Sequence, residues 1–361
     1  MLCKENFTKE HIVAFRADSK RDPGVLERTV FAFGLLEALA RSGLPFVFKG
    51  GTCLILLLEK PCRLSTDIDI IVAPGVNIEP YVTAAAKIFP FIKQEEDLRV
   101  SSNHIEKRHF KFSYCSPISG KDVYILLDVV FAESPYAKTI TKKIRGDFLL
   151  TEPEYVSVCV PSAACMLGDK FTAFAPHTIG ILLHGKKDME VMKQFYDIAT
   201  LLEIVDDFEE VRTTYHRVAA IQRDYRGLHD QNEAFLADTF CAALCIASQD
   251  KFAPMDCAAY KKAINSLRHH IYTTSYNVEI ATGDAVKIAY AAVCLLTGIP
   301  FERVSNDEGV QAHKFKHKFL KIVGYLRKTN LQAFAYAVQM DRLLDRALEI
   351  YPRFLEGMSI K

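Results

Sequence analysis

Apolar and polar positions in the first 160 residues change repeatedly between helical and strand-like spacing. Residues 7–42 have the apolar recurrence of two helices, and Asp22 with Pro23 predicts the start of the second, which Gly43 ends. Short apolar runs bounded by turn residues then predict strands. These strands are expected at 45–48, 67–72, 109–114, 123–131 and 155–160, with helices at 53–59 and 78–89. The mixture predicts an α+β domain.

From Pro161 to the end of the chain the apolar spacing is helical, without a repeat or a low-complexity linker. Helices are expected at 161–174, 189–202, 208–224, 233–247, 258–270, 284–297, 312–327 and 331–350. We therefore expect two domains, 1–160 and an all-α domain at 161–361.

Two carboxylates, Asp67 and Asp69, lie inside the predicted strand 67–72. Side chains two residues apart on a strand point to the same face, so these two face together while Ile68 and Ile70 face the other way. Such close like charges repel unless a cation lies between them. Mg²⁺ is the expected cation because it prefers hard oxygen ligands and is completed by substrate phosphates.

Gly50, Gly51 and Thr52 stand at the junction between the strand 45–48 and the next helix. The glycines let a backbone approach a phosphate, and the first turn of the helix offers free N–H groups and a positive dipole end. Thr52 adds a hydroxyl donor. Alone, the glycines could merely tighten a turn, and the two aspartates could be solvated or capping carboxylates. Their order along the chain makes the combination a candidate phosphate and metal site.

Further polar residues accompany this motif. Asp128 interrupts the apolar strand 123–131, which predicts that it faces a polar site, the alternative being a solvent-exposed aspartate at a strand end. Arg63 either binds a phosphate or pairs with a strand carboxylate. Ser65 is expected to support the metal strand, and Lys49 to reach a phosphate or the sheet edge.

The stretch Phe48-Lys49-Gly50-Gly51-Thr52, followed by Arg63-x-Ser65-x-Asp67-Ile68-Asp69, resembles the signature of the AbiEii/AbiGii nucleotidyltransferase toxins, which belong to the DNA polymerase β-like superfamily. The preceding apolar helix, 25–40, is similar too, and the resemblance covers roughly the first two hundred residues. It implies a small mixed β-sheet nucleotidyltransferase domain flanked by helices. It also implies that Asp67, Asp69 and Asp128 bind the metal, with Asp128 as a third ligand or general base.

Two downstream segments, 169–174 and 193–202, are similar to further blocks of that family. The resemblance implies that Lys170 neutralises triphosphate charge and that Asp197 orients this lysine or the nucleotide, so the first helices of the second domain would complete the active site. Without the resemblance, both would be surface residues. Asp188, after Lys186 and Lys187, is the alternative to Asp197, and the intervening 177–185 is expected to be a mobile loop.

Composition restricts the class of protein. At 361 residues with 50% hydrophobic residues the chain can fill a sizeable core, and a net charge of +1 gives no overall attraction to nucleic acid. The 10 cysteines form no Cys-x-x-Cys and are expected to be buried thiols. We expect no membrane span and no secretory signal, and hence a cytoplasmic protein.

The segment 313–318, His-Lys-Phe-Lys-His-Lys, is the most basic stretch of the C-terminal half. It could hold an RNA backbone. The alternative is the solvated face of the helix 312–327, which Phe315, Phe319 and Ile322 would anchor.

Together these features predict a Mg²⁺-dependent nucleotidyltransferase that moves a nucleotide from an NTP to an acceptor hydroxyl and releases pyrophosphate. The family resemblance implies a toxin that modifies RNA, such as a tRNA 3′ end, and is restrained by an antitoxin. One alternative is transfer to a small hydroxylated molecule, and another is a catalytically silent nucleotide-binding module. The preferred nucleotide, the acceptor and the oligomeric state do not follow from the sequence.

Overall fold

The computed structural model of the chain describes residues 1–16, 21–58, 62–98, 106–229, 231–272, 275–305 and 308–355. The chain divides into two compact units, Met1–Ser162 with His269–Thr274, and Ala163–Arg268 with Ser275–Lys361. Each unit is described by itself below. All ten cysteines lie in the described ranges and are thiols, and Cys115 among them is exposed.

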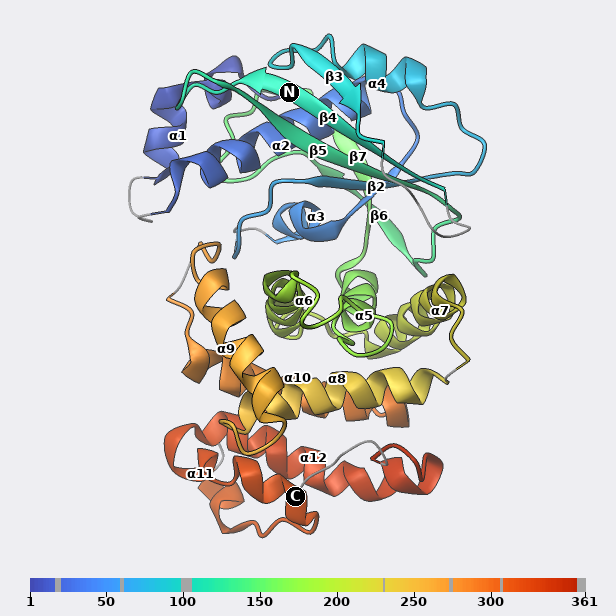
Figure 1. The fold of residues 1–361 in the computed structure, drawn as a ribbon, viewed down its shortest axis with the longest axis vertical. Helices are drawn as coiled ribbons and strands as arrows, with labels where there is room; N and C mark the ends of the chain where they lie inside the picture. The colour runs from blue at the N-terminus through green and yellow to red at the C-terminus, as the bar shows by residue number, and fades with distance from the viewer. Residues whose placement is uncertain are drawn as a thin grey trace. The chain divides into compact units, whose positions relative to one another are not determined.

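The first unit contains a mixed sheet of seven strands in the order β3-β4-β5-β2-β1-β7-β6 (Figure 1). The strands are β1 (Val47–Lys49), β2 (Ile68–Val72), β3 (Lys93–Glu96), β4 (Lys107–Cys115), β5 (Asp122–Phe131), β6 (Thr139–Lys143) and β7 (Ser157–Pro161). The pairs β2–β5 and β1–β7 are parallel and the others antiparallel. The predicted α+β fold, with a mixed sheet followed by helices, is confirmed.

The helices of this unit are η1 (Lys4–Phe7), α1 (Lys9–Arg16), α2 (Pro23–Arg41), α3 (Gly50–Leu57) and α4 (Glu79–Ala85). Helix α2 begins as predicted, because the Asp22 side chain accepts hydrogen bonds from the backbone N–H groups of Gly24 and Val25. Helix α3 begins at Gly50, earlier than expected, and α4 is shorter than the predicted 78–89. The predicted end of α3, at Glu59, lies outside the described residues.

Helix α2 covers one face of the sheet. The ring of its Phe31 stacks on that of Tyr114 in β4, with 3.7 Å between the centroids, and the Tyr114 hydroxyl donates to Glu27. Alternate residues of β4 and β5 are buried on this face, among them Phe110 and Leu127, which are register partners. The intervening residues of β4 and β5 therefore lie on the opposite face.

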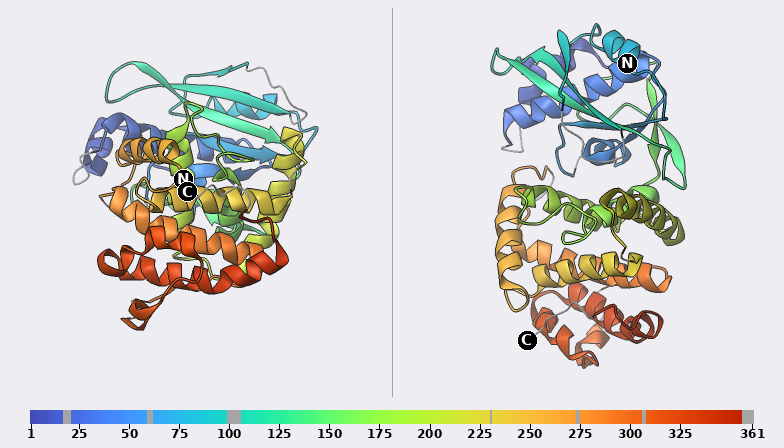
Figure 2. Two further views of the ribbon diagram at one scale, coloured as in Figure 1. Left: turned by 60° about the horizontal axis from the view of Figure 1, so that its bottom comes forward. Right: turned by 45° about the vertical axis from the view of Figure 1, so that its right-hand side comes forward.

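The second unit is helical, and the described part of it contains no strand. Its helices are α5 (Ala163–Ala173), α6 (Asp188–Leu201), α7 (Phe208–Arg226), α8 (Asn232–Ala247), α9 (Pro254–Leu267), α10 (Val278–Thr297), η2 (Glu308–Ala312), η3 (Lys318–Val323), α11 (Leu326–Thr329) and α12 (Leu331–Ile350). Helix α10 packs against both α8 and α12 (Figures 1 and 2). By length and composition it could cross a membrane, but 83% of its apolar window is buried inside the protein, as in a core helix.

The prediction of one helix at 312–327 is wrong. Residues 313–317 are non-helical, and shorter helical turns, η3 and α11, follow them. The buried carboxylate of Asp341 in α12 accepts hydrogen bonds from the backbone N–H groups of Lys316 (2.9 Å) and His317 (3.0 Å). These donors are thereby withdrawn from the i−4 carbonyls that an α-helix would need.

Residues 269–272 return to the first unit after α9. The N–H of Leu64 donates to the carbonyl of His270, and the N–H of Tyr272 to that of Cys62, both at 2.8 Å. Ile271, opposite Arg63 in this bridge, is fully buried. The segment thus joins the sheet domain through backbone bonds, and the predicted helix 258–270 ends earlier, at Leu267.

Candidate active site

A row of polar residues crosses four neighbouring strands of the first unit. Lys49 in β1 is the register partner of Asp69 in β2. Asp69 is in turn the partner of Asp128 in β5, and Asp128 that of His109 in β4. Register partners share a face, and this row lies on the face opposite α2. Two carboxylates on adjacent strands are thus flanked by a lysine and a histidine.

Asp128 lies inside β5 and is held by His109. The Nδ1 atom of His109 lies 2.6 Å from Oδ1 of Asp128, and both side chains are partly exposed. This placement favours the predicted polar site over a strand-end aspartate. Sequence reasoning missed His109, although its alternation with the buried Phe110 and Phe112 places it on the polar face. Its pairing with Asp128 depends on the strand register, which the sequence pattern does not reveal.

Gly50 brings the start of α3 against Asp69. Its φ of +82° is in the left-handed region that favours glycine. A Cβ at this position would lie 2.1 Å from Oδ2 of Asp69, which is far inside a van der Waals contact. The Asp69 carboxylate therefore lies against the first turn of α3, where the helix dipole is positive. A glycine is required here for both conformation and space.

Gly51 is packed against the two residues predicted to support the motif. A Cβ at Gly51 would lie 2.7 Å from Nη2 of Arg63 and 2.7 Å from the hydroxyl oxygen of Ser65. Arg63 is buried and donates through Nη1 to the carbonyl of Leu64 at 3.3 Å. The glycine turn, the arginine and the serine therefore form one packed group.

The hydroxyl of Thr52 is already engaged. It donates to the main-chain carbonyl of Asp67 at 2.6 Å, and the residue is fully buried. A hydroxyl has a single proton to donate, so Thr52 cannot in this arrangement donate to a phosphate. This bond ties the start of α3 to the segment that carries Asp67.

Lys170 in α5 and Asp197 in α6 form a buried ion pair in the second unit. Nζ of Lys170 lies 2.9 Å from Oδ2 of Asp197 and donates to Oε1 of Gln194 at 2.8 Å. Asp188, the alternative to Asp197, instead accepts a hydrogen bond from the backbone N–H of His184. Of the two aspartates, Asp197 is the one that contacts Lys170.

The predicted mobile loop 177–185 is tied to neighbouring helices by several contacts. The backbone N–H of His177 and the hydroxyl of Thr178 both donate to Oδ2 of Asp238 in α8 at 2.8 Å. The Nε2 atoms of His177 and His184 lie 3.2 and 2.8 Å from the carboxylate of Asp256 in α9. These contacts hold the loop at both ends.

The chemistry of the carboxylates suits a magnesium ion, although their arrangement differs from the expected three-ligand site. Within the described ranges no three His, Cys, Asp or Glu side chains are grouped closely enough to hold a metal ion. Magnesium is commonly bound by one or two carboxylates and completed by water and substrate phosphates. Asp67, which directly precedes β2, and Asp69 within β2 both carry hard oxygen atoms of this kind, while the Asp128 carboxylate lies 2.6 Å from His109.

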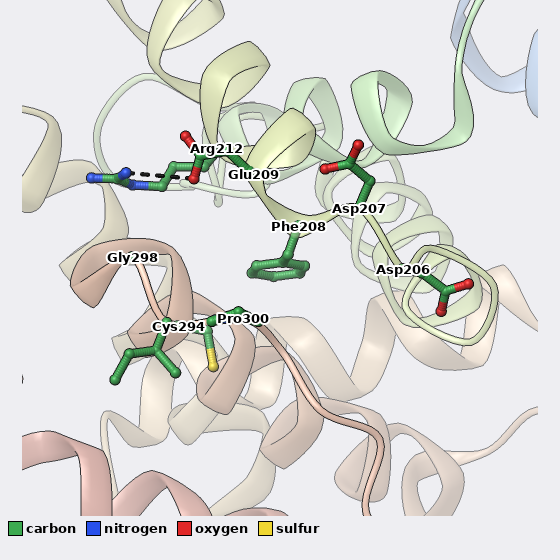
Figure 3. A pocket seen from close by; sticks show the side chains of 9 residues that line it. Asp206, Asp207, Phe208, Glu209, Arg212, Cys294, Gly298 and Pro300 are labelled. Atoms are coloured by element: carbon green, nitrogen blue, oxygen red, sulfur yellow. Dashed lines mark ion pairs between the residues drawn. The ribbon is translucent and has the colours of Figure 1, made fainter.

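A pocket of about 250 Å³ lies in the second unit, and none of the residues that line it is a predicted site residue (Figure 3). It is formed where α7 begins and α10 ends, and the ring of Phe208 points into it. Arg212, on its rim, pairs with Glu209 at 3.7 Å. The pocket contains no arrangement that serves the predicted chemistry.

Comparison with known proteins agrees with these observations. The family model described as "Nucleotidyl transferase AbiEii toxin, Type IV TA system" matches residues 34–265, which is more than half of the chain. The matched range contains every predicted site residue.

Two solved structures are similar at low identity. JHP933 from Helicobacter pylori has 12% identity and a TM-score of 0.42, and the match covers 76% of this chain and 94% of that one. An antigenic nucleotidyltransferase-like protein from Paracoccidioides brasiliensis has 16% identity and a TM-score of 0.35, with 56% and 91% covered. With TM-scores below 0.5, neither carries weight on function. No curated protein matches the sequence.

Proposed function

Since the chain belongs to the AbiEii family of nucleotidyl transferase toxins of type IV toxin–antitoxin systems, we propose that it transfers a nucleotide from an NTP to a hydroxyl of RNA, such as a tRNA 3′ end, in the presence of Mg²⁺. The observation that best supports this proposal is the pairing of Asp69 with Asp128 on adjacent strands, next to the glycine turn. That arrangement supplies carboxylates and backbone N–H groups at one place on the sheet.

The proposed step is an in-line displacement at the α-phosphorus. The acceptor oxygen forms a bond to this phosphorus while the bond to the oxygen that bridges to the β-phosphate breaks, and pyrophosphate leaves with that electron pair. The proton of the acceptor hydroxyl passes to the carboxylate of Asp128. His109 orients this carboxylate through its hydrogen bond to Oδ1.

The other residues bind and orient the nucleotide. Asp67 and Asp69 would hold Mg²⁺, which when bound neutralises negative charge on the phosphates. The backbone N–H groups of Gly50 and Gly51, at the start of α3, would donate to the phosphates. Thr52 fixes the position of Asp67 through its carbonyl.

Four further roles remain predictions. Lys49 and Arg63 are expected to add positive charge for the triphosphate, and Ser65 to support the metal strand. Lys170, oriented by Asp197, is expected to neutralise charge on the leaving pyrophosphate.

Membership of a type IV toxin–antitoxin family implies a cognate antitoxin and an NTP substrate. We place the activity in the cytoplasm, where NTPs and tRNA are available, and assign the antitoxin the role of limiting it.

The proposal is tested by incubating the protein with each α-labelled NTP, Mg²⁺ and total RNA. The wild type should transfer label to RNA, and Asp67→Asn and Asp69→Asn should each lower this transfer about a hundredfold or more, since each removes a charged oxygen ligand. Asp122→Asn, an exposed aspartate at the start of β5, is the matched control and should leave transfer unchanged.

Three results would contradict the proposal. Label that appears in a small hydroxylated molecule instead of RNA would identify the other acceptor class. Absence of NTP consumption by the wild type would identify a silent nucleotide-binding module. Full activity in either site variant would refute the metal assignment.

A further inference from the structure

The chain between Glu308 and Asp341 contains no Asp or Glu, although the whole protein is nearly neutral at a net charge of +1. The basic residues of this segment are Lys314, Lys316, Lys318, Lys321, Arg327 and Lys328, and all six are exposed. Positive charge is therefore concentrated in one part of the second unit. A local concentration of this kind attracts polyanions even when the overall charge does not.

The segment is anchored by one buried carboxylate. Asp341 is 2% exposed. Its two oxygens each lie 2.8 Å from a ring nitrogen of a histidine, Oδ2 from Nε2 of His313 and Oδ1 from Nδ1 of His317. They also accept hydrogen bonds from the backbone N–H groups of Lys316 and His317. A non-helical stretch is thus held in one conformation by four contacts to a single side chain.

This anchoring determines which side chains point outward. His313, Phe315 and His317 are half-buried, and the Phe315 ring packs edge-on against Phe334 with 5.5 Å between centroids. The residues between and after them, Lys314, Lys316 and Lys318, are exposed. In a non-helical stretch such alternation places the three lysines on the same side. Lys318 and Lys321 then share a face of η3, since its turn has three residues.

Four of these lysines have no acidic partner among the residues that the structure describes: Lys314, Lys318, Lys321 and Lys328. Within the same described segment, Lys316 pairs with an acid, Asp345, at 2.5 Å. Elsewhere in the second unit, the exposed Arg303 pairs with Asp206 at 2.7 Å. These four lysines are therefore available to an external anion.

We propose that this basic segment, residues 314–328, binds the phosphate backbone of an RNA. Lysine ammonium groups are compact charges on flexible stems and suit contacts to phosphates that carry no base specificity. The choice of RNA over an acidic protein rests on the proposed function, in which RNA is the acceptor. The segment supplies affinity, whereas the carboxylates of the first unit supply chemistry.

The test measures RNA binding without NTP, so that no transfer takes place. Fluorescence anisotropy with labelled tRNA would compare the full-length wild type with the double variant Lys314→Glu/Lys318→Glu. The matched control is Lys121→Glu/Lys262→Glu, which reverses two exposed lysines and changes the net charge by the same amount. A second variant, Lys314→Gln/Lys318→Gln, removes the charges without adding acids, and thermal unfolding of each variant verifies its fold.

We expect Lys314→Glu/Lys318→Glu to bind tRNA about tenfold or more weakly at about 0.1 M salt, with the control unchanged. The slope of log K against log salt should become shallower by about 0.7–0.9 for each phosphate that the variant no longer neutralises. Equal weakening of tRNA binding in Lys314→Glu/Lys318→Glu and in the control Lys121→Glu/Lys262→Glu would overturn the proposal. A wild type that binds no RNA, or that binds poly-glutamate in its place, would overturn it as well. Since the binding measurement needs no turnover, RNA binding by this segment can be refuted while NTP transfer is observed. Equally, RNA binding can be observed while NTP transfer is absent.

Discussion

At the scale of single residues, the candidate site depends on glycine positions where a Cβ atom would not fit. Gly50 combines a left-handed φ with a close approach to Asp69, and Gly51 a close approach to Arg63 and Ser65. The glycines and the aspartates could be predicted as site residues from the sequence, because they lie close together along one turn and one strand. His109 was not predicted, because its partner Asp128 comes from the neighbouring strand.

Gly50→Ala should therefore inactivate the protein without unfolding it. The substitution costs about 1–2 kcal/mol for the left-handed conformation, and its Cβ must also displace the Asp69 carboxylate. A displacement of about 1 Å at a reacting centre can cost about a hundredfold in rate, so label transfer from NTP should fall by about that factor.

Gly43→Ala is the matched control for this prediction. Gly43 has a nearly identical φ of +83°, but a Cβ there meets nothing within 4 Å. It should lose similar conformational stability in urea unfolding and keep its transfer rate. Equal losses of rate in the two variants would show that the close approach to Asp69 is unimportant.

At the scale of elements, the sequence predicted helices and buried strands from periodicity, and failed where distant polar groups decide the structure. The helix predicted at 312–327 does not form, because Asp341 captures its backbone donors. The strands β3 and β6 were missed because they are short and largely exposed, without a buried apolar side to reveal them. Each lies at an end of the strand order.

The loop between α5 and α6 should show a pH-dependent contribution to stability. Hydrogen bonding of His177 to Asp238 raises the pKa of this histidine against the opposing effect of burial, and Asp256 adds to the rise. Because the pKa of His177 is raised in the folded state, its contribution to the free energy of unfolding is fully present below the ordinary pKa of about 6.5. This contribution is lost as the pH rises through the folded-state pKa.

The free energy of unfolding of His177→Gln should therefore differ from that of the wild type mainly at acidic pH. Since the ring is 47% exposed, the difference at about pH 6 should be no more than about 1 kcal/mol. It should shrink by about pH 9, as measured by urea unfolding across this range. His229→Gln, at an exposed histidine, is the control variant. A difference independent of pH would assign His177 a purely steric role.

At the scale of the whole molecule, the family and the α+β fold followed from the sequence, but the interrupted first unit did not. Residues 269–272 follow a long helical pattern that gives no hint of a return to the sheet domain. Their bonds to Cys62 and Leu64 are backbone bonds, which no side-chain pattern encodes.

Ile271→Ala should consequently weaken the first unit at a place far away in sequence. Truncation of a fully buried isoleucine costs about 2–4 kcal/mol. Hydrogen exchange should report faster exchange at the N–H groups of Leu64 and Tyr272 in this variant. Ile264→Ala, a similarly buried isoleucine in α9, is the control and should speed exchange in α9 alone. Unchanged exchange at Leu64 in Ile271→Ala would show that the return segment, residues 269–272, does not support Arg63.

The return segment also sets an order of events during synthesis. Domains generally fold from the N-terminus as the chain leaves the ribosome, but Cys62 and Leu64 cannot find their backbone partners until α5 to α9 have been made. Arg63 lies between them, under the glycine turn. A nascent or prematurely ended chain therefore carries an unfinished candidate site, and a cell that translates this protein meets a completed one only after Tyr272 has emerged.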